Sequence, residues 1–520
     1  MTAVNPADVS PVAPAEPLER SVVHSRSVVG RNIAVLLGSQ AVTWSLALVL
    51  TIMVPRYLGP DGVGQLRLGA AVWALAVVIG ELGTNMLVIL EFAHDPALGF
   101  ALVKPVLRLR LLGAFLGIVG VLTFVLLAGY DLETSVVVGI VGIGVLIGMM
   151  ADVARGALFG FQWMTVTAQT DVIAKVVTVL VVVGVLIAGG DTVAVAVAMI
   201  VPAVVSAVLL FRALQTKRDR VGAPHPSPPA RAVLKRSSPF LYSSIVVAGY
   251  SSLDVVIISL VATQKEVGWY AVAATLMGTL LFLPNTIVTS LFPALAQVHE
   301  ENAGAASELL ARALRTTMIF AFPISVGIMV VAGPLVTLLF GSDFTPAGAV
   351  LAAGGIVLLL MFPTILIGGI ARATGRVRVF NVAITLATIM TIPLDLVLVP
   401  WTRDRFDNGA IGGALSYIIT ELLVLIVLIW KVAPILTHRR TVVRVLKCLL
   451  ASAAIFLAWP LRNEFILVPV AVGSIAYFAM VLLLRIPDAE ERQMAHRLWM
   501  RIRSGGRARP ESSMTSEASP

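Results

Sequence analysis

The sequence predicts an all-α integral membrane protein with about fourteen transmembrane helices: two parallel six-helix lobes and two extra C-terminal helices. Three observations predict this fold class. The 520 residues are 58% hydrophobic and only 13% charged, whereas soluble domains have about 25% charged residues. Apolar windows of about 20 residues, the length of a bilayer-spanning helix, recur along the chain. A segment is also repeated at a fixed offset, which indicates that half of the fold was duplicated.

The apolar windows predict fourteen spans. They lie at about residues 33–55, 66–92, 105–129, 135–154, 171–189, 192–211, 239–262, 269–296, 315–339, 347–371, 379–400, 410–430, 445–460 and 465–484. Spans two and eight are longer than a bilayer needs, so we expect them to tilt or to project from it.

The distribution of basic residues predicts the orientation. With the N-terminus inside, all but six of the 38 Lys and Arg residues lie on the cytoplasmic side. The six external ones are Arg56, Arg67, Lys265, Arg403, Arg405 and Arg462. Because cytoplasmic loops carry an excess of Lys and Arg, we predict a multi-pass protein of the cell membrane with both termini cytoplasmic.

The repeat predicts the relation between the two lobes. The segment LGPDGVGQLRL at 58–68 aligns with ATQKEVGWYAV at 262–272, and in both copies a Val-Gly pair lies in a short polar break between apolar runs. Spans one to six form one copy and spans seven to twelve form the other, and because six is even, both copies enter the membrane in the same direction. The lobes are then related by a pseudo-twofold axis along the membrane normal, and substrate would bind in a central cleft between them.

These observations divide the chain into six parts. They are a disordered cytoplasmic tail (1–30), a first lobe (31–212), a basic cytoplasmic linker (213–238), a second lobe (239–430), the last two spans (431–485) and a basic, disordered cytoplasmic tail (486–520). The basic linker and tail are sufficiently explained as topology anchors, so no nucleic-acid partner is predicted.

Polar residues in spans two and eight are the first candidates for a substrate site in the cleft. Arg67, Glu81 and Asn85 lie 14 and 18 residues apart, which places them on one face of a straight helix. The repeat offset places Glu81 opposite Asn285, which follows Pro284. This proline is expected to kink span eight, which is tolerable only where protein or water receives the freed carbonyls.

Spans one and seven supply the other candidates. Tyr250 and Asp254 share a face of span seven, Asn32 and Thr43 lie on one stripe of span one, and Arg31 lies at the cleft mouth. Charges deep in a bilayer usually face a cavity and mark function, so Glu81 and Asp254 are also candidates for ion coupling by protonation. By contrast, the pairs Asp152/Arg155 and Asp171/Lys175 are expected to be self-neutralised helix ends.

Several segments resemble the polysaccharide-biosynthesis family, the lipid-linked oligosaccharide flippases of the MOP (MATE-like) superfamily. They are NIAVLLGSQAVTWSLALVLTIMVPRYLGPDGVGQ (32–65), SSLDVVIISLVATQKEVGWYAVAATL (251–276), SLFPALAQ (290–297), LVPW (398–401) and GAIGGALSYIITELLVL (409–425). The resemblance covers about residues 31–485. It implies a flippase that moves a polyprenyl-(pyro)phosphate-linked oligosaccharide from the inner to the outer leaflet by alternating access, for cell-envelope polysaccharide biosynthesis. It also implies membrane lipids and other polysaccharide assembly proteins as partners, and a groove for the polyprenyl tail near spans thirteen and fourteen.

The residues predict no cofactor, metal site or catalytic centre. The single cysteine cannot form an intrachain disulfide, the six histidines lack ligand spacing, and no G-x-x-x-x-G-K-[ST] motif is present. The predicted external loops are too short for the catalytic domain of a glycan ligase or polymerase, so the chain is not expected to be an enzyme.

Two other transport functions remain as alternatives. A lipid II (peptidoglycan precursor) flippase also has fourteen spans and an anionic cargo, but its cleft is typically rich in arginine, whereas this one offers chiefly Arg67 and Arg31. A MATE-type cation or drug antiporter has twelve spans and typically an acidic residue in span one, and span one of this chain has no acid.

Overall fold

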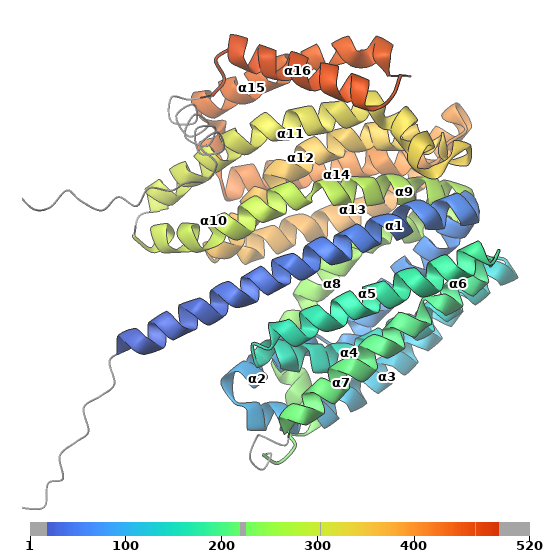
Figure 1. Ribbon diagram of the computed structural model, residues 1–520, viewed down its shortest axis with the longest axis vertical. Helices are drawn as coiled ribbons and strands as arrows, with labels where there is room; N and C mark the ends of the chain where they lie inside the picture. Colours follow the sequence, from blue (N-terminus) through green and yellow to red (C-terminus); the bar gives the residue numbers. More distant parts are fainter. Residues whose placement is uncertain (1–17, 219–224, 302, 463, 488–520) are drawn as a thin grey trace, which may run out of the picture. The chain divides into compact units, whose positions relative to one another are not determined.

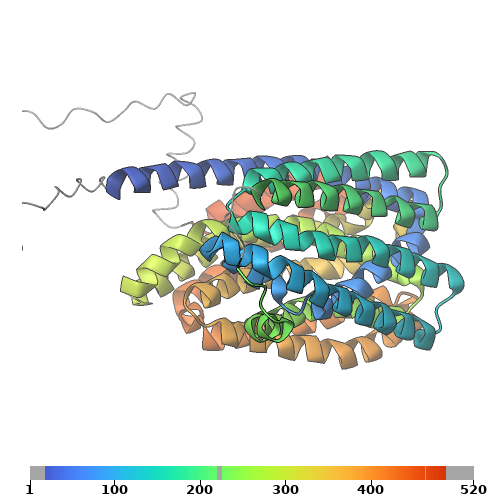
Figure 2. The same cartoon turned by 90° about the horizontal axis from the view of Figure 1, so that it is seen from below.

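A computed structural model describes residues 18–218, 225–301, 303–462 and 464–487 of the chain. All regular structure in these residues is helical. The chain divides into two compact units, one ending at Ser252 and the other beginning at Leu253. Within each unit, long helices run side by side (Figures 1 and 2). The prediction of an all-α fold is confirmed.

The described part of the first unit contains eight helices, three of which begin after a capping aspartate. They are α1 (Leu18–Glu81), α2 (Thr84–His94), α3 (Pro96–Ala128), α4 (Leu132–Gly160), α5 (Met164–Ile187), α6 (Thr192–Ala198), α7 (Ile200–Arg218) and α8 (Ala230–Val261), the last of which continues into the second unit. Asp95, Asp131 and Asp191 precede α3, α4 and α6, and their side chains accept hydrogen bonds from first-turn N–H groups. At Asp95 the bonds from Leu98 and Ala97 lower the pKa of the carboxyl, because they stabilise its ionised form.

Helix α1 contains more than one predicted span. Its helical geometry is interrupted at Gly59 (φ 67°, ψ 179°), where two helical segments meet. Glycine adopts this left-handed φ without steric cost, and Pro60 follows it directly. The kink therefore separates predicted span one from the start of predicted span two, as the polar break in the sequence indicates.

Predicted span two, residues 66–92, is itself broken near its middle. Leu82 and Gly83 both have positive φ (52° and 69°), so α1 ends at Glu81 and α2 begins at Thr84. A left-handed conformation costs a residue with a side chain about 1–2 kcal/mol, so the surrounding structure must hold Leu82 in it. The expectation of one straight helix is wrong here: Gly80 and Gly83 weaken the helix locally, and the positive φ angles of Leu82 and Gly83 end it.

The core of the first unit holds α2 in place. Val88 and Phe92 of α2 are buried together with Val106 of α3, Leu158 of α4 and Val233 of α8. The break at 82–83 therefore lies between two firmly packed segments and is part of the fold.

The second unit is organised around α12. Its elements are α9 (Gln264–Leu280), α10 (Phe282–Glu301), α11 (Ala303–Phe340), η1 (Ser342–Phe344), α12 (Ala347–Ala373), α13 (Val377–Phe406), α14 (Ala410–Lys431), η2 (Pro434–Thr437), α15 (Arg439–Ala453), η3 (Ala454–Leu461) and α16 (Leu467–Leu483). Helix α12 packs against α9, α10, α11, α13 and α14. Helices α15 and α16 pack against α11 on its other side (Figure 1).

The described residues contain twelve helical stretches that are long and apolar enough to cross a membrane. The first of them, Gly38–Glu81, includes most of predicted span one and most of predicted span two, on either side of Gly59. The last predicted span corresponds to the shorter apolar helix Leu467–Leu483. Each of the fourteen predicted spans thus has a helical counterpart.

The predicted tails and linker lie only partly within the described residues. Residues 1–17 and 488–520 are outside them, as are residues 219–224 of the linker. Helix α1 begins at Leu18, inside the predicted tail 1–30, and α7 and α8 extend into the predicted linker 213–238. Residues 18–54 contain no proline, so a helix can continue N-terminally from span one without a break.

One buried glutamate fastens the start of α9 to the loop between α13 and α14. Glu266 is 5% exposed and accepts hydrogen bonds from Arg403 Nη2 at 2.6 Å and from the Gly409 N–H at 2.6 Å. Its carboxylate also accepts from the Thr263 N–H, while the Thr263 hydroxyl accepts from the Glu266 N–H, which completes a capping box. This arrangement ties together the ends of three helices.

We expect Glu266→Gln to destabilise the protein by about 2–3 kcal/mol, because it weakens a largely buried ion pair and leaves one N–H group poorly paired. The thermal unfolding midpoint of the purified protein in detergent measures this. Glu308→Gln is the matched control, because the Glu308 carboxylate that pairs with Arg315 is itself exposed, and an ion pair open to solvent is worth about 0–1 kcal/mol. Equal shifts for the two variants would contradict the structural role of Glu266.

Candidate functional site

The candidate site in the first unit lies at the break in span two. The backbones of Gly80 in α1 and Gly113 in α3 are in direct contact, and a Cβ on either would meet the other glycine. Small residues permit such close helix crossings in membranes. The crossing brings Glu81, the last residue before the break, within reach of Arg110, one turn before Gly113.

Arg110 is the central side chain of this site. It is fully buried, and its Nη1 lies 3.5 Å from Glu81 Oε1. Its Nε donates to Thr84 Oγ1 at 3.1 Å, and its Nη1 donates to the Met149 carbonyl in α4. The Thr84 hydroxyl donates in turn to the Glu81 carbonyl at 2.7 Å. Arg110 therefore contacts the chain on both sides of the break.

The charges continue from Arg110 into α4 and α5. Asp152 interacts electrostatically with Arg110. Arg155 Nε donates to Asp152 at 3.1 Å, and its Nη1 donates to Asp171 at 2.6 Å. Glu81, Arg110, Asp152, Arg155 and Asp171 thus form a row of alternating charges across α1, α3, α4 and α5. The predicted pairing within Asp152/Arg155 is present, but Asp171 pairs with Arg155 of the neighbouring helix, because α4 and α5 pack side by side.

The other candidates in the first unit are not gathered at this site. Arg67 is half-buried on α1, and its Nε has no hydrogen-bond partner among the described residues. It lies 14 residues before Glu81, about 21 Å along a helix. Asn85 lies beyond the break and faces Gly156 of α4, so it does not share one straight helix face with Arg67 and Glu81.

The remaining candidates on α1 and α8 occupy varied settings. Thr43 is half-buried, and its hydroxyl donates to the Gln40 carbonyl at 3.0 Å. Tyr250 is half-buried on α8. Arg31 and Asn32 belong to α1, but their side chains lie outside the described residues.

The second unit holds a separate polar site around Asp254. The hydroxyl of Tyr270, in α9, donates to Asp254 Oδ2 at 2.5 Å. Asp395, in α13, is fully buried, lies close to the Ser416 hydroxyl and interacts electrostatically with Asp254. No described residue gives either oxygen of Asp395 a hydrogen bond of normal geometry. Asp254 of α8 and Asp395 of α13 therefore bring two carboxyl groups to one polar site within this unit.

The eighth predicted span is interrupted as its proline indicates. Helix α9 ends at Leu280 and α10 begins at Phe282, shortly before Pro284. Asn285 is exposed, and its Nδ2 donates to the Leu281 carbonyl at 2.8 Å. The break between α9 and α10 therefore lies a few residues before Asn285, the position that the repeat pairs with Glu81. The hydrogen bond of the Asn285 side chain goes to the backbone of the preceding turn.

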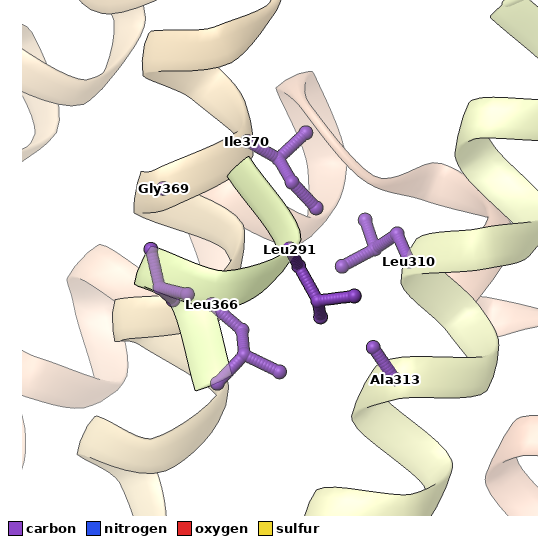
Figure 3. A pocket seen from close by; sticks show the side chains of 7 residues that line it. Leu291, Leu310, Ala313, Leu366, Gly369 and Ile370 are labelled. Atoms are coloured by element: carbon purple, nitrogen blue, oxygen red, sulfur yellow. The ribbon is translucent and has the colours of Figure 1, made fainter. Parts of the chain in front are cut away.

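Two apolar cavities are found among the described residues of the second unit. One, enclosed by α10, α11 and α12, has a volume of about 10 Å³ (Figure 3), which is too small for a ligand. The other is a groove of about 350 Å³ between α11 and the last helices. Its lining includes Phe320, Ile324, Ile455, Val470 and Phe478. Among the described residues, no group of three or more His, Cys, Asp or Glu side chains is placed to hold a metal ion.

Sequence reasoning missed Arg110, Thr84, Tyr270 and the pairing of Asp395 with Asp254. A signal for Arg110 was present in the spacing of the basic residues. Lys104 and Arg108 are four residues apart and both are exposed, whereas Arg110, two residues further, falls on the opposite helix face. The other three carried no such signal, because their partners lie on other helices and are brought close only by packing.

The fold resembles those of known membrane transporters. The structure of the lipid II flippase MurJ in an inward closed conformation aligns over 86% of this chain and 98% of its own, with a TM-score of 0.67 and 15% identity. An inward-facing multidrug resistance MATE family transporter of the MOP superfamily aligns over 76% and 96%, with a TM-score of 0.59 and 15% identity. At such low identity these similarities describe the fold alone.

Sequence comparison identifies the family. The probable low-salt glycan biosynthesis flippase Agl15 of Haloferax volcanii is 25% identical over 195 residues, which are 37% of this chain. The alignment spans only 41% of that relative's length. A sequence profile of the polysaccharide biosynthesis proteins matches residues 29–299. Because this match covers more than half of a chain whose fold is that of MOP superfamily transporters, the protein belongs to the polysaccharide biosynthesis protein family.

Proposed function

We propose that this protein is a flippase that moves an oligosaccharide linked to polyprenyl (pyro)phosphate from the inner to the outer leaflet of the cytoplasmic membrane. The observation that carries the proposal is the family match over residues 29–299. It is supported by the relative whose name describes a glycan biosynthesis flippase. The protein acts as a transporter and not as an enzyme, and both of its termini are cytoplasmic.

The cargo has an anionic headgroup, so the cleft must offer cationic or helix-dipole partners. We assign headgroup and sugar contacts to Arg67, Asn85, Tyr250 and Asn285, with Asn32 and Thr43 in span one and Arg31 at the mouth. The lobes alternate access to this cleft. Movement of negative charge to the outside is favoured by a negative interior, by about 2.3 kcal/mol per charge at 100 mV.

Glu81 and Asp254 are the proposed sites of ion coupling. Each is a carboxyl group in a membrane-spanning helix, and each has a polar partner that orients it: Arg110 for Glu81 and Tyr270 for Asp254. An ionisable group at this depth is usually functional. Asp395 joins Asp254 in the second unit, so one proton can be shared between two carboxyl groups there.

The polyprenyl tail is proposed to lie in the apolar groove between α11 and α16. The groove has a volume of about 350 Å³ and is lined almost entirely by apolar side chains. A hydrocarbon chain gains nothing from polar contacts, so shape and van der Waals packing against such a lining are what a tail requires. The sugar chain stays with the polar residues of the cleft.

Deletion of the gene, followed by identification of lipid-linked intermediates, tests the proposal. We expect a polyprenyl-linked oligosaccharide to accumulate on the inner leaflet and the matching surface glycan to disappear. Accumulation of lipid II would instead identify a peptidoglycan precursor flippase. Hypersensitivity to cationic drugs without any accumulated intermediate would identify an antiporter, and either result would overturn the proposal.

A further inference from the structure

The break in span two is bridged by one buried side chain. Arg110 contacts the Glu81 carboxylate before the break and the Thr84 hydroxyl after it. Helix α2 begins after Gly83 without a side-chain cap, so its first turn depends on other contacts. Thr84 is buried and receives its hydrogen bond from Arg110 Nε. The position of this first turn is therefore linked to the position of the guanidinium group.

Arg110 has two acids within electrostatic reach. Glu81 is the last residue of α1, directly before the break, and Asp152 lies in α4. The contact with Glu81, at 3.5 Å, is longer than an ordinary charge-assisted hydrogen bond. Arg110 Nη2 has no hydrogen-bond partner among the described residues. The guanidinium therefore has a donor to spare and a second carboxylate toward which it can move.

We infer that Arg110 is a positioning residue that couples the Glu81 carboxylate to the geometry of the break at Leu82–Gly83. While Glu81 attracts Arg110, the guanidinium stays where its Nε reaches Thr84, and the first turn of α2 is held. When that attraction is lost, Arg110 moves toward Asp152, releases Thr84 and loosens the break. The inference about the break stands on these contacts; its consequence for transport rests on the proposed function.

Hydrogen exchange of the purified full-length protein in lipid nanodiscs tests the inference. We expect Glu81→Gln, Arg110→Lys and Thr84→Val each to raise amide exchange in residues 82–88 by about tenfold, a loss of local protection. Lysine keeps the charge but cannot bridge two segments as the planar guanidinium does. Asp152→Asn removes the competing acid, so exchange at 82–88 should stay at or below the wild-type level.

Arg108→Lys is the matched control on the same helix. Because Arg108 is exposed, this substitution should leave amide exchange at 82–88 unchanged. Unchanged exchange at 82–88 in Glu81→Gln and Arg110→Lys would overturn the inference. A uniform rise in amide exchange throughout the first unit would also overturn it, because Arg110 would then stabilise the whole unit and not the break in particular. Glycan export by the same variants is a separate readout: normal export with a loosened break would contradict the proposed role of Glu81 in transport and leave the positioning role intact.

Discussion

Gly83→Ala is expected to destabilise the protein by about 3 kcal/mol, the sum of a left-handed backbone penalty and an overpacking cost. Gly83 has φ 69°. A Cβ at this position would meet the Ser237 carbonyl oxygen at 2.6 Å and the Leu241 nitrogen at 2.7 Å. Both are backbone atoms of α8, so relief requires movement of a whole helix. The thermal unfolding midpoint in detergent and the amount of protein in the membrane measure the effect.

Gly129→Ala separates the two contributions. Gly129 has φ 70°, almost the value at Gly83, but nothing lies within 4 Å of a Cβ built there. The substitution therefore imposes only the backbone penalty, about 1 kcal/mol. Similar losses of stability for the two variants would show that α8 does not constrain the break.

Asp254→Asn is expected to reduce glycan export in the deletion strain by about tenfold or more, while the protein accumulates normally. The asparagine side-chain oxygen can still accept the hydrogen bond from Tyr270, so the local packing is kept. What is lost is the ability to bind and release a proton at this depth. The amount of surface glycan per molecule of membrane protein is the appropriate measurement.

Asp395→Asn is expected to reduce export in the same way, because Asp395 interacts electrostatically with Asp254. Asp404→Asn provides the control, since Asp404 lies on the same helix, α13, but is exposed. Wild-type export with both Asp254→Asn and Asp395→Asn would remove this carboxyl pair from the mechanism. Loss of export with Asp404→Asn would point to a general sensitivity of α13.

Much of the helical layout was predictable because it depends on local properties. Apolar length determines where a helix can cross a bilayer, and each predicted span has a helical counterpart. Pro284 predicted the interruption of span eight, because proline removes a backbone hydrogen-bond donor and clashes with the preceding turn. The kink at Gly59 coincides with a polar Gly-Pro-Asp-Gly stretch, a turn signal in any context.

The break at Leu82–Gly83 could not be predicted in the same way. No proline lies near it, and although Gly80 and Gly83 weaken a helix locally, they do not specify a left-handed conformation at Leu82. Contacts of Gly83 with α8 and of Thr84 with Arg110 hold it. Both partners are distant in sequence, so only the folded unit brings them together. The same reason hid the contacts of Asp254 with Tyr270 and Asp395.

Hydrophobic length and family motifs can be recognised along the chain, so they are sufficient to identify a helical membrane protein of the polysaccharide biosynthesis family. Which charges meet depends on how the helices pack. In the sequence, Arg110 looks like one more basic residue near the end of a span. In the structure, α3 is rotated so that Arg110 is buried while Arg108 is exposed. A buried charge must find a partner, and the identity of that partner depends on how α1, α3 and α4 pack, which no local pattern specifies.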